Sequence, residues 1–353
     1  MVKKQKDEVT FVAAGDVFLA GKIVRQDGTC KEMITQGPES VFDEVAPIFQ
    51  NKDVAFCNLE SGLSEQGKPQ KGRASAFISR PENIDVLKKA GISIVSFANN
   101  HSMDFGPEAM LDTLKRLDQH GIGHAGAGAN IVEARQPSVI KKNGIALAFL
   151  AYTTNNNVPK QTAAGPQTPG LAMLRLSAFF PPPHVNREDF KAMEEDVRKA
   201  KKNADFVIVS CHWGISDGGN HTVAVHQQGI GHAAIDAGAD IVMGHHQHAY
   251  QGVELYKGKI ICHGLGNFIF DTITAPFSPG TILFHCTFQK NLITEAWVQP
   301  VIQGNHAHPR PLLPEEETSR KMLSHLQELS QELGARLTIK AGKAIIPLNK
   351  AKK

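Results

Sequence analysis

One local pattern recurs along this chain and constrains its fold more than any other feature. An amphipathic helical stretch is followed by a short turn, a run rich in β-branched residues and then polar side chains. The pattern occurs in "ENIDVLKKAGISIVSFANNH" (82–101), "DVRKAKKNADFVIVSCHWG" (196–214) and "GIGHAAIDAGADIVMGHHQH" (229–248). Apolar strands that alternate with helices are typical of a partly parallel sheet covered on both faces. The sequence therefore predicts an α/β fold.

Polar side chains come directly after each of these strands and after two earlier ones, "VTFVAAGD" (9–16) and "DVAFCNLE" (53–60). In open α/β sheets, binding sites form at the carboxyl ends of the strands. We therefore expect the five strand ends to converge on one edge of the sheet. The side chains concerned are those of Asp16, Asn58, Glu60, Asn99, Asn100, His101, His212, His246 and His248.

Composition places the chain among ordinary globular proteins. Of its 353 residues, 41% are apolar and 21% are charged. The net charge of +3 lies partly in the terminal runs "MVKKQK" and "NKAKK", so no clustered basic face is indicated and we expect no nucleic-acid partner. The five cysteines are odd in number and mostly lie in apolar runs, which indicates reduced, buried thiols. No apolar run approaches the length of a spanning helix, so we expect a cytoplasmic protein without a membrane partner.

The chain shows no boundary sharp enough to divide it into independent domains. We expect one domain over residues 1–313, followed by a C-terminal helix and tail (314–353) packed on the same domain. Residues 153–186 are rich in Pro, Asn, Thr and Gly and predict a loop insertion. Residues 107–121 predict a helix, and the segments after residue 250 predict antiparallel strands.

Carboxylates and imidazoles at several strand ends suit a divalent transition metal such as zinc, manganese, iron or nickel, whereas calcium prefers oxygen ligands alone. The number of ligands fits two ions better than one, and two ions can share and activate a water molecule. Taken singly, Asp16 or the pair Asn99–Asn100 could instead be turn residues. Turn chemistry, however, does not require a carboxylate or a histidine at each of these ends.

Six motifs, in order, closely resemble the CapA/PgsA family of capsule-associated, poly-γ-glutamate-related proteins. They are "GDVFLAG", "CNLESGL", "SFANNHSMDFG", "SCHWG", "GADIVMGHHQHAYQGVELYKGKII" and "GLGNFIFD", and the likeness spans about residues 9 to 272. That family is similar to the calcineurin-like metallophosphoesterases. The resemblance implies a four-layered α/β sandwich with mixed sheets and a two-metal centre at the strand ends.

The resemblance also implies roles for individual residues. Asp16, Glu60, Asn100, His212, His246 and His248 match metal-binding positions, with Glu60 at the position of a metal-bridging aspartate. His101 matches a histidine that acts as a general acid or stabilises an oxyanion. This sequence departs from the superfamily at Asp16-Val17-Phe18, where the usual Asp-x-His histidine is absent, and at Glu60, where aspartate is usual. These departures put phosphatase activity in doubt more than metal binding.

Further residues are predicted to support this site. Asp104 either orients His101 or caps the following helix, and both interpretations stay open. Lys71 and Arg73 either bind a substrate carboxylate or lie on a solvated loop. Residues predicted to support the metal ligands are Asn58, Asn99, His245, Asn267 and Asp271.

The favoured function is that of a metal-dependent hydrolase acting on a small-molecule or peptide substrate. The family resemblance implies a γ-glutamyl or other amide bond, with a phosphate ester as an alternative. A second hypothesis keeps the metals but exchanges an α-proton, as in a peptide or amino-acid epimerase. A third is a non-catalytic component of poly-γ-glutamate or capsule synthesis, although ligands on five strand ends argue against a vestigial site.

Overall fold

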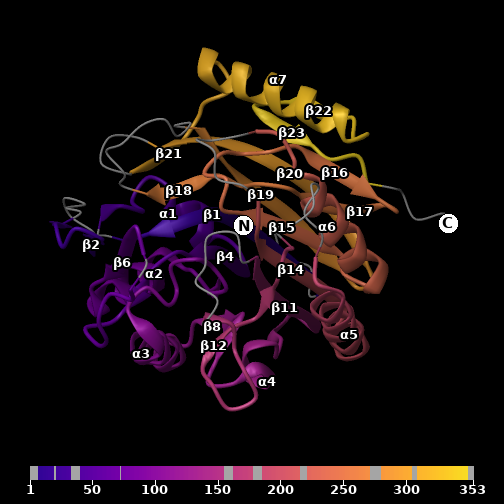
Figure 1. The fold of residues 1–353 in the computed structure, drawn as a ribbon. Helices are drawn as coiled ribbons and strands as arrows, with labels where there is room; N and C mark the ends of the chain where they lie inside the picture. The colour runs from indigo at the N-terminus through magenta and orange to yellow at the C-terminus, as the bar shows by residue number, and fades with distance from the viewer. Residues whose placement is uncertain are drawn as a thin grey trace.

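Two large mixed β-sheets stack face to face in this protein, and helices cover the outer face of each sheet (Figure 1). The computed structural model describes residues 7–19, 21–32, 40–71, 73–154, 162–177, 185–214, 221–270, 280–303 and 308–348.

The first sheet has ten strands in the order β22-β23-β20-β19-β1-β4-β7-β8, with β18 paired to β1 and β21 paired to β20. The strands β18, β4, β7 and β8 run parallel to their neighbours, whereas the pairs that involve β19 to β23 are antiparallel. The bounds are β1 (Glu8–Phe18), β4 (Val54–Leu59), β7 (Ile94–Ser96), β8 (Gly123–Ala125), β18 (Asn267–Phe270), β19 (Gly280–Gln289), β20 (Leu292–Gln303), β21 (Pro309–Pro311), β22 (Thr338–Lys340) and β23 (Lys343–Ile345).

The second sheet has seven strands in the order β10-β11-β14-β15-β17-β16, with β13 paired to β11. The strand β14, "FVIVSCH", is buried along its whole length because the sheet is covered on both faces. The bounds are β10 (Ser138–Lys142), β11 (Ile145–Thr154), β13 (Met173–Leu174), β14 (Phe206–His212), β15 (Ile241–His245), β16 (Val253–Tyr256) and β17 (Lys259–Cys262).

Three hydrophobic clusters separate four layers. Phe11 and Phe56 of the first sheet pack with Ile208 of the second in the cluster between the sheets. On the outer face of the first sheet lie α1 (Ala46–Gln50), α2 (Ile84–Ala90) and α3 (Gly106–Gln119). On the outer face of the second sheet lie α5 (Arg187–Asn203) and α6 (Val225–Ala237). The predicted four-layered α/β sandwich with mixed sheets is confirmed.

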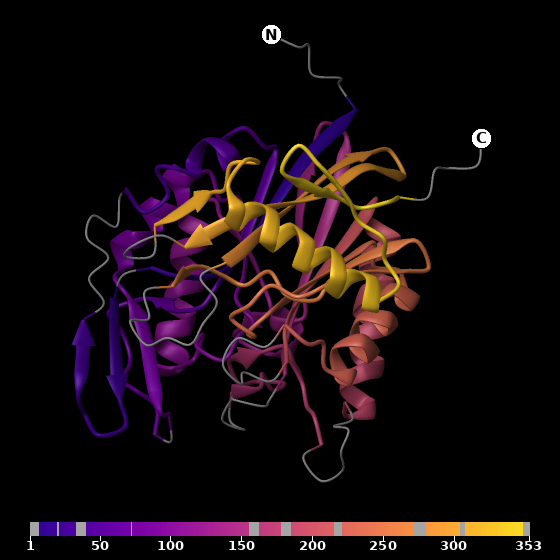
Figure 2. The same ribbon diagram turned by 90° about the horizontal axis from the view of Figure 1, so that it is seen from above.

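The helix α7 (Glu317–Glu332) lies across one edge of the sandwich, as Figure 2 shows from above. It contacts β20, β22 and β23 of the first sheet and β16 of the second. Its apolar side chains, Met322, Leu323 and Leu326, join the cluster between the sheets. Among the described residues, no helix combines the length and the apolar character needed to cross a membrane.

A small four-stranded sheet packs outside the sandwich. Its order is β3-β2-β6-β5. Its strands are β2 (Gly21–Arg25), β3 (Cys30–Glu32), β5 (Gly62–Leu63) and β6 (Ser75–Ser79). Phe77 of β6 packs with Phe18 at the end of β1 and Phe270 at the end of β18, so this sheet covers the carboxyl ends of two main strands. No pattern in the sequence predicted this sheet.

The segment predicted as a loop insertion, 153–186, carries some regular structure. The strand β11 extends into it as far as Thr154, β13 pairs with β11, and β12 (Gly170–Leu171) pairs with β9 (Ala127–Gly128). Residues 155–161 and 178–184 lie outside the described residues. A short helix, α4 (Ile131–Ala134), follows β9.

Candidate metal centre

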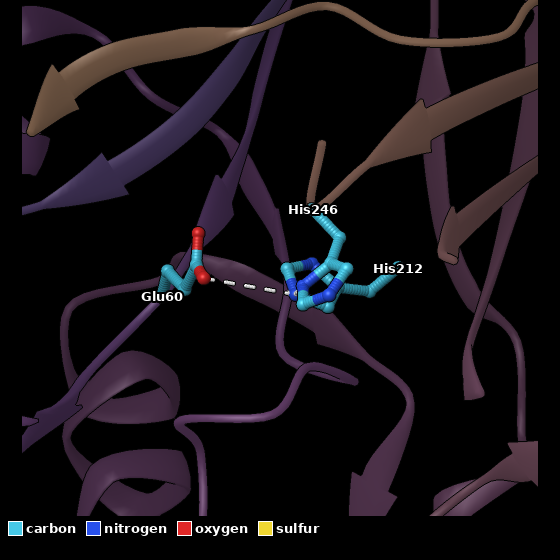
Figure 3. A group of neighbouring side chains, drawn as sticks. All are labelled: Glu60, His212 and His246. Atoms are coloured by element: carbon cyan, nitrogen blue, oxygen red, sulfur yellow. Dashed lines mark hydrogen bonds and ion pairs between the residues drawn. The ribbon is translucent and has the colours of Figure 1, made fainter. Parts of the chain in front are cut away.

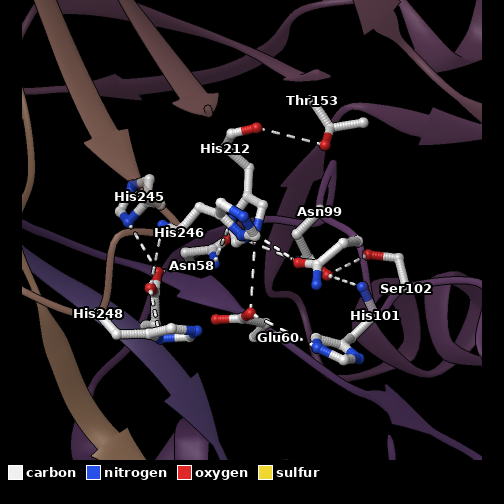
Figure 4. Close-up of polar contacts among 12 residues, drawn as sticks. Asn58, Glu60, Asn99, His101, Ser102, Thr153, His212, His245, His246 and His248 are labelled. Atoms are coloured by element: carbon white, nitrogen blue, oxygen red, sulfur yellow. Dashed lines mark hydrogen bonds and ion pairs between the residues drawn. The ribbon is translucent and has the colours of Figure 1, made fainter. Parts of the chain in front are cut away.

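The polar side chains at the strand ends meet where the two sheets face each other (Figure 4). In the first sheet, β1 and β4 run parallel with Asp16 opposite Asn58. In the second sheet, β14 and β15 run parallel with His212 opposite His245. The hydrogen bond partners of His212 come from both sheets, so the site joins the carboxyl ends of both.

Asp16 lies at an irregular point of β1, where the pairing with β4 and β18 shifts register. The preceding residue is glycine because the backbone of Gly266 comes very close: a Cβ at Gly15 would lie 1.8 Å from the Gly266 carbonyl oxygen. The Asp16 N–H donates to that same oxygen (2.9 Å). This contact holds the backbone of Asp16 at the end of the sheet.

The carboxylate of Asp16 is fully buried and has several polar partners. Its Oδ1 accepts a hydrogen bond from Asn58 Nδ2 (2.9 Å) and lies 3.1 Å from His245 Nδ1. Its Oδ2 accepts the backbone N–H of His246 (3.2 Å) and lies 3.8 Å from His248 Nδ1. Burial alone would raise the pKa of Asp16, but the hydrogen bond and charge of His245 outweigh it and lower that pKa below the usual value.

Glu60 follows β4 and is the buried carboxylate in the middle of the site (Figure 3). Neither carboxylate oxygen accepts a hydrogen bond from a described residue. Its Oε1 lies 3.6 Å from His212 Nε2 and 4.0 Å from His101 Nε2. Burial, together with the charges of Asp16 and Asp104, raises the pKa of Glu60 well above its usual range. A buried carboxylate without a donor is costly unless a cation compensates it.

His212 and His246 bring further electron-pair donors to Glu60. Nε2 of His212 lies 3.0 Å from Nδ1 of His246 and 2.5 Å from Oδ1 of Asn100. A single hydrogen on Nε2 can point to only one of these neighbours, so at most one of them accepts a hydrogen bond from His212 Nε2. Burial holds the pKa of His212 well below its usual range and lowers that of His246 to about 3. Burial therefore favours the neutral form of both rings, which is the form that binds metal ions.

His246 and His248 both adopt positive φ angles, 95° and 56°, which are uncommon for residues other than glycine. The intervening Gln247 donates its side-chain amide to the carbonyl of Trp213 (2.9 Å). His248 Nδ1 lies 2.6 Å from Oδ1 of Asn267, the first residue of β18. These contacts hold a strained turn that directs two imidazoles to the site.

The donor atoms fall into two groups, each with its atoms within 4.8 Å of one another: Glu60, His212 and His246, and Asp16, Glu60 and His248. Glu60 belongs to both. Carboxylate oxygens and imidazole nitrogens in such groups fit a divalent transition metal, and a shared carboxylate is the arrangement of a two-metal centre. The Asn100 amide oxygen next to His212 is a further candidate ligand atom.

His101 lies at the rim of the site, with Nε2 on the side of Glu60. Its Nδ1 is 2.6 Å from Oδ2 of Asp104, so Asp104 orients the ring; the other interpretation, a helix cap, does not hold because α3 has no side-chain cap. Arg73 is buried rather than solvated and forms an ion pair with the other oxygen of Asp104. Lys71 is exposed, next to Gln70, whose N–H donates to the Asp104 carbonyl (2.8 Å).

Three of the remaining predicted residues, Asn58, His245 and Asn267, contact a candidate ligand directly. Asn99 is buried and bonds instead to Asn58 and to the backbone of Leu59 and His101. Asp271 lies outside the described residues.

Two contacts of the site were not predicted from the sequence. Phe77 stacks on the ring of His101, with centroids 3.8 Å apart and planes 2° apart. Thr153 donates its hydroxyl to the His212 carbonyl (3.3 Å). No local pattern marks either residue, although Thr153 stands near the end of an apolar run, "IALAFLAYTT", as the other site residues do.

The chain matches the family described as "Bacterial capsule synthesis protein PGA_cap" over residues 10–272. It is 29% identical over 358 residues to the "PGA biosynthesis protein CapA" of Bacillus subtilis (strain 168), covering 100% of this chain and 86% of that protein. It is 29% identical over 272 residues to the "Capsule biosynthesis protein CapA" of Bacillus anthracis, covering 76% of this chain and 61% of that protein. A solved structure, a 5'-nucleotidase precursor from Thermus thermophilus, aligns with a TM-score of 0.47 and 12% identity over 91% of this chain and 58% of that chain.

Proposed function

Because this chain belongs to the bacterial capsule synthesis protein family PGA_cap, we propose that it is a metal-dependent hydrolase acting on a γ-glutamyl or other amide bond. The observation that supports this most strongly is the position of Glu60, a buried carboxylate that two groups of ligand atoms share. The ligands we propose for two divalent ions are Asp16, Glu60, Asn100, His212, His246 and His248.

When bound, such a pair of ions supplies an activated water and polarises the carbonyl that this water attacks. The protein's own residues do the rest. Asn58 and His245 hold Oδ1 of Asp16, and Asn267 holds the ring of His248. His101, oriented by Asp104, presents Nε2 on the Glu60 side of the site, where it donates a proton to the leaving nitrogen.

The γ-glutamyl bond is proposed from the resemblance to poly-γ-glutamate-related proteins and from the name "PGA biosynthesis protein CapA" of the Bacillus subtilis relative. The same donor set suits a phosphate ester, so both substrate classes belong in one screen. Exchange of an α-proton, as in an epimerase, uses the same polarised carbonyl: the Cα–H bond breaks and forms again while the amide bond stays intact. A purely structural part in capsule synthesis needs no turnover at all.

The test is metal analysis of protein purified without an affinity tag, combined with a screen of γ-glutamyl amides and phosphate esters. We expect bound transition metal and release of glutamate from an amide, both lost in Glu60→Gln. Turnover of phosphate esters alone would move the assignment to a phosphoesterase. Exchange of the α-proton with deuterium without hydrolysis would indicate an epimerase. Bound metal with none of these activities would favour the structural role.

A further inference from the structure

The strand β6 and the residue two positions before it contact the pair His101–Asp104 from outside the main sandwich. Arg73 forms an ion pair with Oδ1 of Asp104. The backbone N–H of Phe77 donates to Oδ2 of Asp104 (2.7 Å), the same oxygen that holds His101 Nδ1. The ring of Phe77 lies parallel to that of His101 at a centroid distance of 3.8 Å. One short segment therefore touches both members of the pair.

These contacts restrain the His101 ring in two ways. The hydrogen bond to Asp104 sets which nitrogen faces inward, and the Phe77 ring sets the plane in which the imidazole lies. Phe77 is itself fixed by Phe18, at a centroid distance of 4.8 Å, and by Phe270, at 6.0 Å. Asp104 is only 1% exposed, and a carboxylate so deeply buried needs a paired cation, which Arg73 provides.

We propose that Arg73 and Phe77 are positioning residues that hold His101 for proton donation to the leaving group. This inference rests on the proposed hydrolase function. It also replaces the predicted substrate-binding role of Arg73, since its guanidinium is paired with a buried carboxylate. The small sheet β3-β2-β6-β5 thereby becomes part of the active site rather than a separate addition to the sandwich.

The first experiment compares two probes that differ in the leaving group. The γ-(4-nitrophenyl) ester of glutamate releases an anion that needs no proton, whereas γ-glutamyl-ethylamide releases a nitrogen that needs one. In Phe77→Leu and Arg73→Gln we expect kcat for the amide to fall roughly 10- to 100-fold, and kcat for the ester to change less than about threefold. KM and metal content should stay unchanged. An equal loss on both probes indicates general damage and overturns the proposal.

The second experiment tests the hydrogen bond between His101 and Asp104 directly, without measuring turnover. In protein labelled with ¹⁵N-histidine, the Nδ1 proton shared between His101 and Asp104 should give a downfield, slowly exchanging signal, assigned by its loss in His101→Asn. We expect Phe77→Leu and Arg73→Gln to lose or broaden this signal, and Arg73→Lys to keep it. Ile78→Val, in the same strand, is the matched control because Ile78 packs toward Gly62 instead.

An unchanged signal in both Phe77→Leu and Arg73→Gln overturns the proposal, whatever the kinetics. If one variant does not fold, the other decides the result. Should the wild-type protein hydrolyse neither probe, the proposed function fails on its own, while the spectra still report whether Arg73 and Phe77 hold His101.

Discussion

Nε2 of His212 and Nδ1 of His246 lie 3.0 Å apart, although the two residues come from separate strands and face a buried carboxylate. Two neutral imidazoles this close to each other and to Glu60 can bind the same metal ion. We expect His212→Ala to reduce the bound metal from about two ions per chain to about one, with the fold intact, because the residue ends a strand rather than filling the core. His212 is a better test than His246, whose φ of 95° would strain an alanine.

The measurement is metal content by mass spectrometry after gel filtration, with thermal unfolding on the same sample. His124→Ala is the matched control, since that imidazole pairs with the exposed Asp118 at 3.2 Å, away from the site. A His212→Ala protein with wild-type metal content would show that the imidazole is not a ligand.

Glu60→Gln should remove both ions, because both groups of ligand atoms contain this carboxylate. The substitution keeps the shape of the side chain and deletes only its charge. A metal ion that binds the folded protein raises its free energy of unfolding, by about 2.7 kcal/mol when the free metal concentration is 100 times Kd. This increase should vanish in Glu60→Gln. The check is the unfolding midpoint with and without a chelator, with the exposed Glu65→Gln as control. Retention of one ion would mean that Glu60 serves a single metal.

Much of the sandwich could be predicted because its helix ends and its buried strands are marked by short stretches of sequence: a glycine after a helix and a run of apolar residues for a strand. The strand predicted within residues 82–101 is β7 (Ile94–Ser96), and the predicted helix at 107–121 is α3 (Gly106–Gln119). The helices α2 and α6 end at Gly91 and Gly238, with φ of 93° and 117°, where the sequence placed the turns. Strand ends could be predicted to meet because parallel strands share one carboxyl edge.

What could not be predicted depends on contacts between distant segments. The strand β1 continues to Phe18, beyond the predicted end at Asp16, because its last residues pair with β18 after a shift of register. Arg73 is buried only because the small sheet folds against Asp104. The hairpin of β10 and β11 did leave a signal, Asn143-Gly144 with φ of 49° and 78°, which a search for two-residue turns would have found.

Lys71 remains the predicted contact for a substrate carboxylate, since it is exposed and adjacent to Gln70, whose N–H meets the Asp104 carbonyl. An exposed charge pair contributes up to about 1 kcal/mol, so Lys71→Ala should raise KM by at most about fivefold and leave kcat unchanged. Steady-state kinetics at two salt concentrations is the check, because salt weakens such a pair. Lys68→Ala, another exposed lysine of the same loop, should have no effect.

Gly244 lies near the end of the strand β15, and its lack of a side chain lets the backbone of His263 come close. A Cβ there would lie 1.9 Å from the His263 carbonyl oxygen and 2.4 Å from Trp213 Nε1, which donates to that oxygen. Gly244→Ala should lower the free energy of unfolding by roughly 1–3 kcal/mol and weaken metal binding at the adjacent histidines. In contrast, Gly229→Ala, in α6 with no atom near its Cβ, should stabilise the protein by about 0.5–1 kcal/mol. The free energy of unfolding of each variant, measured by urea unfolding, should fall in Gly244→Ala and rise in Gly229→Ala.

The last prediction separates proton donation from metal binding, and it concerns His101. Its ring meets Asp104 at 2.6 Å, whereas its Nε2 stays 4.0 Å from Glu60, so the residue belongs to neither group of ligand atoms. His101→Asn should therefore leave the metal content near that of wild type. Loss of general acid catalysis should lower turnover of an amide by about 10²- to 10⁴-fold. Paired metal analysis and kinetics on one preparation decide the matter: metal lost with activity makes His101 a ligand, and unchanged turnover assigns the proton donor to another residue.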